Sequence, residues 1–237
     1  MNAAHKVKIF GVIALLGLFI LSVPAQWDKK PYTEWSEKDA TKLLNDSPWG
    51  QTQTATDTSG MTGVARADSS QSRISDVTQV QYRIRLFSSK PIRQAISRTI
   101  ELQLKDKLTD DMKGRLKALA SADFPDYVVV TVVCESPTAN SKIQEATAAL
   151  YKFATADLKN NTYLLTKGGN RVFLQEYQAP RNDGFGARFI FPRLVNGEAY
   201  VTANSGELLF HSELPKLVEL NMRFKVKEMM FGGKLEY

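Results

Sequence analysis

The stretch YVVVTVVC (residues 127–134) decides the fold of this chain. Its side chains are mostly β-branched and apolar, without the polar alternation of a half-exposed strand, and Ser136-Pro137 ends it. A continuous apolar run of this kind is typical of a strand that is covered on both faces. We therefore expect residues 127–134 to lie at the centre of a sheet.

The residues before this run predict one strand and two helices. Apolar and polar side chains alternate over residues 79–86, which is the period of a half-buried strand. Ser89 precedes a predicted helix in which an apolar residue recurs at every fourth position. Thr109 begins a second helix, with Asp110 and Asp111 in the first turn, where the helix dipole favours negative charge.

The residues after the run predict one more helix and then a series of antiparallel strands. One apolar stripe runs through residues 141–158, as in an amphipathic helix. From Thr162 onward the period is two, and turn signals separate the strands at residues 167–170, 182–184 and 196–197. This order predicts an α+β fold, with a mostly antiparallel sheet and about three helices on one face.

Residues 26–49 form a short Trp-rich segment, with a predicted helix that begins after Ser36. All three tryptophans of the chain, Trp27, Trp35 and Trp49, lie in this segment. They either pack onto the main domain or form an exposed aromatic patch that binds a partner or ligand. The tendency of aromatic side chains to serve as core anchors favours packing.

Residues 50–75 are rich in Thr, Ser, Gln and Gly, with few large apolar side chains. A stretch of this composition buries too little surface to offset the entropy lost on ordering. We therefore predict a flexible linker or long loop over residues 50–75, followed by one α+β domain over residues 76–237.

Residues 1–25 have the three parts of a signal peptide. Lys6 and Lys8 come first, residues 9–23 are an uncharged apolar run, and small residues follow at the cleavage site. The run is short for a membrane-spanning helix, which needs about 20 apolar residues. We expect cleavage after Ala25, which leaves no transmembrane segment; the alternative is an uncleaved N-terminal anchor.

Composition narrows the location and the partners. The net charge is +6, and removal of the signal would lower it to +4, because the signal contains two lysines and no acid. This mild excess and the expected export argue against a nucleic-acid partner. Cys134, the only cysteine, cannot form a disulfide within the chain, which suits a bacterial envelope better than an animal extracellular space. We therefore expect a periplasmic or secreted bacterial protein.

Few residues of the expected mature chain are typical of catalysis. His211 and Cys134 are its only histidine and its only cysteine. No nucleophile-elbow pattern accompanies His211 and no basic residue flanks Cys134, so we interpret both as structural. Too few imidazoles and thiols remain for a typical zinc site, and no EF-hand or phosphate-loop pattern occurs. We expect no metal and no cofactor; a hydrolase that uses carboxylates or His211 remains the alternative.

The densest basic cluster of the sequence consists of Arg83, Arg85, Lys90, Arg93 and Arg98. Arg83 and Arg85 share one face of the predicted strand, where they could meet an anionic ligand or a membrane surface. A solvated polar sheet face has the same pattern, so both interpretations stay open.

The segment WSEKDA (residues 35–40), followed by SPW (residues 47–49), resembles the start of a group of uncharacterised exported bacterial proteins. These proteins carry a W-S-x-K-[DE]-A…SPW segment just after a signal peptide. The similarity continues at Phe191-Pro192-Arg193 and over residues 224–236, and it does not cover the predicted linker. The resemblance implies export in a bacterium, and it implies no activity and no functional residues.

These observations together predict a non-enzymatic binding or interaction module of the bacterial cell envelope. Its partner is expected to be an envelope protein or an anionic ligand. The candidate binding residues are Arg83, Arg85, Arg93, Trp35 and Trp49.

Overall fold

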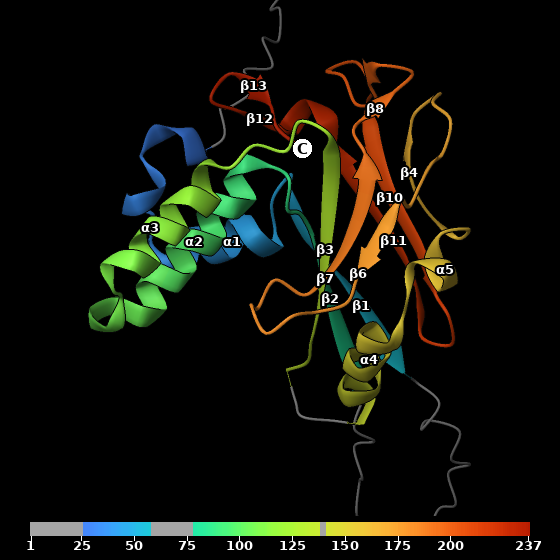
Figure 1. Cartoon of the computed structure of the whole chain (residues 1–237), viewed down its shortest axis with the longest axis horizontal. Helices are drawn as coiled ribbons and strands as arrows, with labels where there is room; N and C mark the ends of the chain where they lie inside the picture. Colours follow the sequence, from blue (N-terminus) through green and yellow to red (C-terminus); the bar gives the residue numbers. More distant parts are fainter. Residues whose placement is uncertain (1–25, 58–77, 138–140) are drawn as a thin grey trace, which may run out of the picture.

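A computed structural model describes residues 26–57, 78–137 and 141–237 (Figure 1). The predicted signal and residues 58–75 of the predicted linker lie outside the described residues. Helices and antiparallel strands are both well represented, and the predicted α+β class is confirmed. Within the described ranges, none of the helices has the length and apolar character that crossing a membrane requires.

The larger sheet has five antiparallel strands in the order β1-β2-β3-β7-β6. The bounds are β1 Gly50–Asp57, β2 Thr78–Leu86, β3 Tyr127–Glu135, β6 Glu176–Gln178 and β7 Ala187–Pro192. The apolar run at residues 127–134 forms β3, and it occupies the middle of this sheet. Val128, Val130 and Val132 are fully buried, because a strand at this place has neighbours on both edges and side chains packed on it.

A second sheet of four antiparallel strands packs on the first, in the order β11-β10-β4-β5. The bounds are β4 Thr162–Thr166, β5 Val172–Phe173, β10 Glu207–Leu214 and β11 Val218–Lys225. The ring of Phe210 lies 5.4 Å from the ring of Phe189 and 6.2 Å from that of Phe191, measured between centroids. The main core therefore lies between the two sheets.

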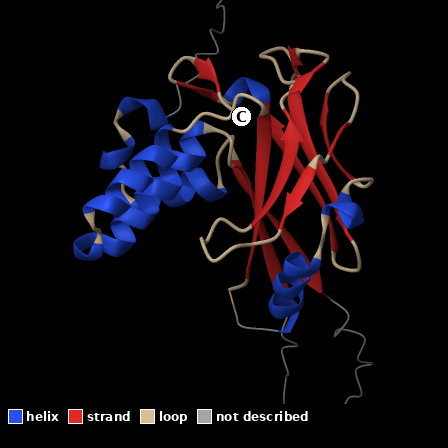
Figure 2. Cartoon of the chain, in the orientation of Figure 1, coloured by secondary structure: helices blue, strands red, loops and turns tan. Residues whose placement is uncertain are grey.

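The helices are divided between two places (Figures 1 and 2). Helices α1 (Glu37–Asn45), α2 (Lys90–Leu104) and α3 (Asp110–Ser121) pack together as one group, in which α1 contacts β1 and β2. Helix α4 (Ser141–Lys152) packs separately on β2 and β3, and α5 (Thr155–Leu158) contacts β6 and β10. The remaining short elements are η1 Gln26–Lys29, η2 Tyr32–Glu34, η4 Lys105–Lys107, β8 Leu194–Val195, β9 Glu198–Ala199, η5 Val226–Glu228, β12 Met230–Phe231 and β13 Lys234–Leu235.

Strand β1 corrects the prediction of a linker that begins at residue 50. It pairs with β2 from Gly50 opposite Arg85 to Asp57 opposite Thr78. The low hydrophobicity of this stretch suggested a linker. An edge strand needs little apolar surface, however, when its threonines favour the extended backbone and its glutamine side chains form hydrogen bonds. A Cβ at Gly50 would come within 2.3 Å of the Leu44 carbonyl oxygen, so the glycine lets β1 start directly beside the end of α1.

The Trp-rich segment packs onto the rest of the protein, which confirms the favoured interpretation. The side chains of Trp35 and Trp49 are 1% and 0% exposed, and both belong to the main core. Trp49 Nε1 donates a hydrogen bond to the Glu236 carbonyl oxygen at 2.8 Å, and its ring meets Phe231 edge to face at 6.1 Å. The Trp-rich segment is thereby joined to the last residues of the chain.

Candidate functional site

The outward face of the four-stranded sheet carries a basic hollow. Strand β11 alternates, with Leu220, Met222 and Phe224 buried and Arg223 and Lys225 exposed. In β10 the even-numbered residues are buried, and the odd-numbered ones point to the opposite face, where Glu207 and Glu213 are exposed while Leu209 and His211 are covered by neighbouring side chains. The sheet therefore presents a mixed polar and apolar surface away from the core.

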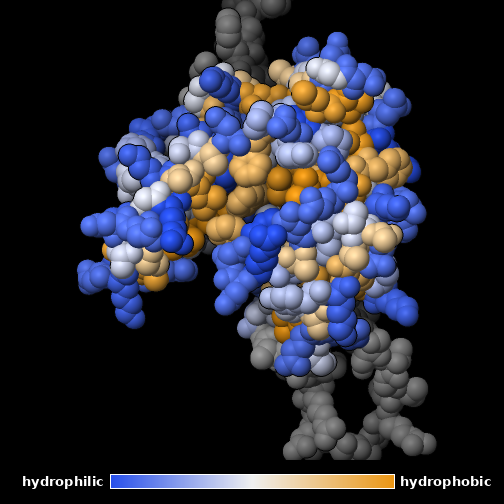
Figure 3. Space-filling model, viewed as in Figure 1, coloured by the Kyte–Doolittle hydropathy of each residue, from blue (hydrophilic) through white to orange (hydrophobic). Residues whose placement is uncertain are grey.

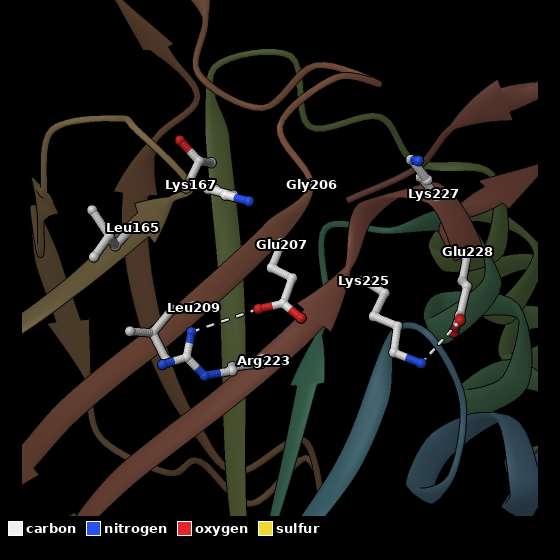
Figure 4. Close-up of a pocket in the computed structure, with 10 residues that line it drawn as sticks. Leu165, Lys167, Gly206, Glu207, Leu209, Arg223, Lys225, Lys227 and Glu228 are labelled. Atoms are coloured by element: carbon white, nitrogen blue, oxygen red, sulfur yellow. Dashed lines mark hydrogen bonds and ion pairs between the residues drawn. The ribbon is translucent and has the colours of Figure 1, made fainter.

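This surface contains a hollow of about 640 Å³ (Figure 4). We call this hollow the basic groove, and its cationic lining residues are Lys167, Arg223, Lys225 and Lys227. Two carboxylates, those of Glu207 and Glu228, and the apolar side chains of Leu165 and Leu209 also line it. Four cations against two acids leave the groove with an excess of positive charge.

The four cations come from three parts of the fold. Lys167 follows β4 in the turn that leads to β5, and its side chain passes within 3.8 Å of the position that a Cβ would take on Gly206. Arg223 and Lys225 belong to β11, and Lys227 belongs to η5. In Figure 4, Lys167 and Lys227 lie on opposite sides of the hollow, with the β10 and β11 side chains between them.

Two of the cations form ion pairs and two do not. Arg223 Nη1 lies 3.6 Å from Glu207 Oε2, and Lys225 Nζ lies 3.2 Å from Glu228 Oε1. Both pairs are well exposed, and pairs of this kind contribute roughly 0–1 kcal/mol to stability. Lys167 and Lys227 have no ion-pair partner among the described residues.

A second hollow, of about 750 Å³, adjoins the basic groove. It shares Arg223, Lys225 and Glu228 with the groove, and it continues toward Lys42 and Asp46 at the end of α1. The two hollows together run from the β4–β5 turn, past β11, to α1. A ligand longer than a single small ion could contact both.

Arg83 and Arg85, which the sequence singled out, serve the fold rather than the groove. Arg85 is 8% exposed, with Nε donating to the Leu44 carbonyl oxygen at 3.0 Å and Nη2 to Asn45 Oδ1 at 2.8 Å. Burial lowers the pKa of Arg85 to about 10. Arg83 Nε pairs with Glu135 Oε2 at 2.9 Å. Together they join β2 to the end of α1 and to β3.

Arg93 also binds backbone. Its side chain is 1% exposed, and Nη1 donates to the carbonyl oxygens of Phe87, at 3.2 Å, and Ser88, while Nη2 donates to that of Ala122. Burial lowers its pKa to about 10. Because Trp35 and Trp49 are core residues, they form no exposed aromatic patch. The structure brings none of the predicted site residues into the basic groove.

Sequence reasoning missed the basic groove, although part of its signal is visible in the sequence. The alternation over residues 218–226 predicts a strand, and cations on the outer face of a strand are typical of an ordinary solvated surface. Lys167 stands only in a predicted turn. A run of cations at alternate positions, Arg223, Lys225 and Lys227, is the available indication.

His211 is buried on β10 and is engaged by neighbouring side chains. Its ring stacks on Tyr163 with 4.6 Å between centroids, and Nδ1 lies 2.8 Å from Asn221 Oδ1. The nearest carboxylates are those of Glu219, at 3.6 Å from Nδ1, and Glu213, at 3.8 Å from Nε2. No hydroxyl or thiol of the described residues forms a hydrogen bond with the ring.

Cys134 lies on β3, in the other sheet from His211. Burial raises the pKa of its thiol to about 12, so the thiolate that a nucleophile requires is scarce at neutral pH. Among the residues described, no three His, Cys, Asp or Glu side chains are grouped as metal ligands would be.

Comparison with protein-family models, curated proteins and solved structures found no match to this chain. The function of the protein is therefore inferred from the geometry of the basic groove.

Proposed function

We propose that the protein is a non-enzymatic binding module that recognises an anionic ligand in the basic groove. The observation that carries the proposal is the position of Lys167 and Lys227. They flank the hollow and have no ion-pair partner among the described residues. Unpaired ammonium groups on both sides of a concave surface favour a ligand that spans the space between them.

The two existing ion pairs are compatible with this role. Exposed pairs contribute little to stability, so an anionic ligand can exchange with Glu207 or Glu228 at a small free-energy cost. Leu165 and Leu209 add apolar contact within the hollow. The adjoining hollow at α1 favours an extended chain over a single ion. The proposed ligand is thus an anionic polymer or an acidic protein segment.

Export to a bacterial envelope is part of the proposal. It is supported by the three-part pattern of residues 1–25 and by the resemblance to exported bacterial proteins. The ligand would then be met in the periplasm or outside the cell. The form of the hydrolase alternative that uses His211 has no comparable support, because His211 is engaged by Asn221 and no hydroxyl or thiol of the described residues forms a hydrogen bond with its ring.

The test uses dextran sulfate as the anionic probe and uncharged dextran as the control ligand. We expect dextran sulfate to bind, with an affinity that falls as salt rises because exposed charges are screened. The double variant Lys167→Gln/Lys227→Gln should weaken binding by at least roughly tenfold, equivalent to about 1.4 kcal/mol.

The matched control is Lys117→Gln/Lys152→Gln, which removes the same charge from exposed positions on α3 and α4. Its affinity should stay close to that of the unmodified protein. An equal loss of binding in both double variants would mean that net charge, not the basic groove, attracts the probe, and the proposal would fail.

A further inference from the structure

A separate hollow, of about 370 Å³, lies on the face of the five-stranded sheet that points away from the four-stranded sheet. Its walls include Phe87, which follows β2, Phe124, which follows α3, and Val129 and Ile190 from β3 and β7. We call it the aromatic pocket. It shares no lining residue with the basic groove. Its volume lies at the lower end of the range of small-molecule sites, which begins at about 300 Å³.

The apolar walls of the aromatic pocket are held in place before any ligand binds. Phe87 and Phe124 meet edge to face with 5.9 Å between centroids. The guanidinium carbon of the buried Arg93 lies 4.9 Å from the centre of the Phe124 ring, and Arg93 also binds the Phe87 carbonyl oxygen. Figure 3 shows apolar surface gathered between the α1–α3 group and the strands. Fixed walls lower the ordering entropy that binding requires.

Arg188 lines the same pocket and has an unsatisfied donor. Its Nη2 pairs with Asp183 Oδ2 at 2.5 Å, and its guanidinium carbon lies 5.6 Å from the centre of the Phe185 ring. Its Nη1 is buried and has no hydrogen-bond partner among the described residues. Buried polar atoms are nearly always hydrogen-bonded, so this nitrogen calls for an explanation. An acceptor that enters the pocket beside Arg188 would provide the missing partner.

The charges around the pocket restrict what that acceptor can be. Asp183 already balances the charge of Arg188, and Glu176 also lines the pocket. A carboxylate ligand at Arg188 would therefore meet the negative charge of Asp183 and Glu176, whereas a neutral carbonyl oxygen would not be repelled. We propose that the aromatic pocket binds an uncharged aromatic ring that bears an amide carbonyl, whose oxygen accepts from Arg188 Nη1.

The test compares three fluorinated probes by fluorine NMR on the purified protein. They are para-fluorobenzamide, para-fluorobenzoate and fluorobenzene, which share the ring and differ in the acceptor. We expect the benzamide to bind at least roughly tenfold more tightly than the other two, the factor that one hydrogen bond to a charged donor supplies. Equal affinity of benzamide and fluorobenzene, or no binding of any probe, would overturn the proposal.

The source of the ring is distinguished by competition. N-acetylphenylalanine amide carries the same ring and amide as an aromatic residue within a polypeptide. If it displaces para-fluorobenzamide at lower concentration than unlabelled benzamide does, the pocket recognises an aromatic residue of a protein partner. The reverse order supports a free small molecule.

Two variants and one control connect the binding to the pocket. Arg188→Lys keeps a cation opposite Asp183 but loses the second donor nitrogen, so the preference for benzamide over fluorobenzene should disappear. Ile190→Phe fills the pocket and should abolish binding of all probes. Arg115→Lys alters an exposed arginine on α3 that does not line the pocket, and it should change nothing. Thermal unfolding of each variant verifies that it is folded, and unchanged benzamide binding to folded Arg188→Lys or Ile190→Phe would disprove the assignment.

Discussion

The side chain of Gln53 forms hydrogen bonds with the backbone of β11, the strand that contains Asn221. It does so as a paired neighbouring strand would. Its Oε1 accepts from the Asn221 backbone nitrogen at 2.9 Å, and its Nε2 donates to the Glu219 carbonyl oxygen at 2.8 Å. Gln51 continues the pattern by donating to the Arg223 carbonyl oxygen at 3.1 Å. Strand β11 is an edge strand, whose unpaired backbone groups would otherwise face solvent or another chain. Two side chains of β1 thus connect the edges of the two sheets.

Gln53→Leu should destabilise the protein, because it removes two hydrogen bonds and leaves the β11 backbone without those partners. We expect the free energy of unfolding to fall by about 1–2 kcal/mol. The measurement is urea unfolding, with Thr54→Val, an exposed position on the opposite face of β1, as the control. A loss no larger than that of the control would show that the side-chain bridge contributes nothing.

Two glycines should respond in opposite directions to replacement by alanine. Gly50→Ala places a Cβ 2.3 Å from the Leu44 carbonyl oxygen, and we expect a loss of about 1–3 kcal/mol because backbone must shift. Gly114→Ala lies in α3, where nothing lies within 4 Å of the new Cβ, so it should stabilise the helix by about 0.5–1 kcal/mol. Thermal unfolding of both variants gives the sign of each change in stability. Destabilisation by Gly114→Ala would contradict the open space found around this position of α3.

Arg93→Met should reduce stability without affecting the basic groove. The substitution leaves the carbonyl oxygens of Phe87, Ser88 and Ala122 without their donor, which we expect to lower the free energy of unfolding by roughly 2–4 kcal/mol. Arg115→Met, on the exposed side of α3, is the control, with an expected change within about 0.5 kcal/mol. If Arg93→Met had normal stability but no longer bound dextran sulfate, Arg93 would have to be a ligand contact, and its structural role would be refuted.

Cys134 should react slowly with iodoacetamide. Because burial raises the pKa of its thiol from 9.0 to about 12, the thiolate fraction at pH 8 is lower by roughly a thousandfold than in an exposed cysteine. Raising the pH toward 12 should increase the rate while the protein remains folded, since deprotonation limits the reaction. The unfolded protein in urea serves as the reference, and equal rates in the folded and unfolded states would refute the burial of this thiol.

The sequence was sufficient to predict those elements whose pattern is local. The β-branched run of β3, the four-residue period of α2 and the acids that begin α3 each express a preference of neighbouring residues, and all three elements formed as predicted. The packing of the tryptophans also agreed with their chemistry. The sequence did not predict β1, because the contacts that stabilise this strand come from β2 and β11. Both are distant in sequence, so the local pattern of β1 does not reveal them.

The role of each arginine could not be predicted for a related reason. Arg85 and Arg93 bind backbone carbonyl oxygens of residues that are distant in sequence, and a guanidinium that is satisfied in this way can be buried. Lys167 and Lys227 line the same hollow only because β4, β10 and β11 are neighbours in one sheet. Composition and periodicity by themselves determined the α+β class and the central strand, and they favoured packing of the tryptophans, since these features depend on short-range preference and on the removal of apolar surface from water. Only the tertiary structure decided which cations are exposed and which are buried, because that depends on partners supplied by the rest of the chain.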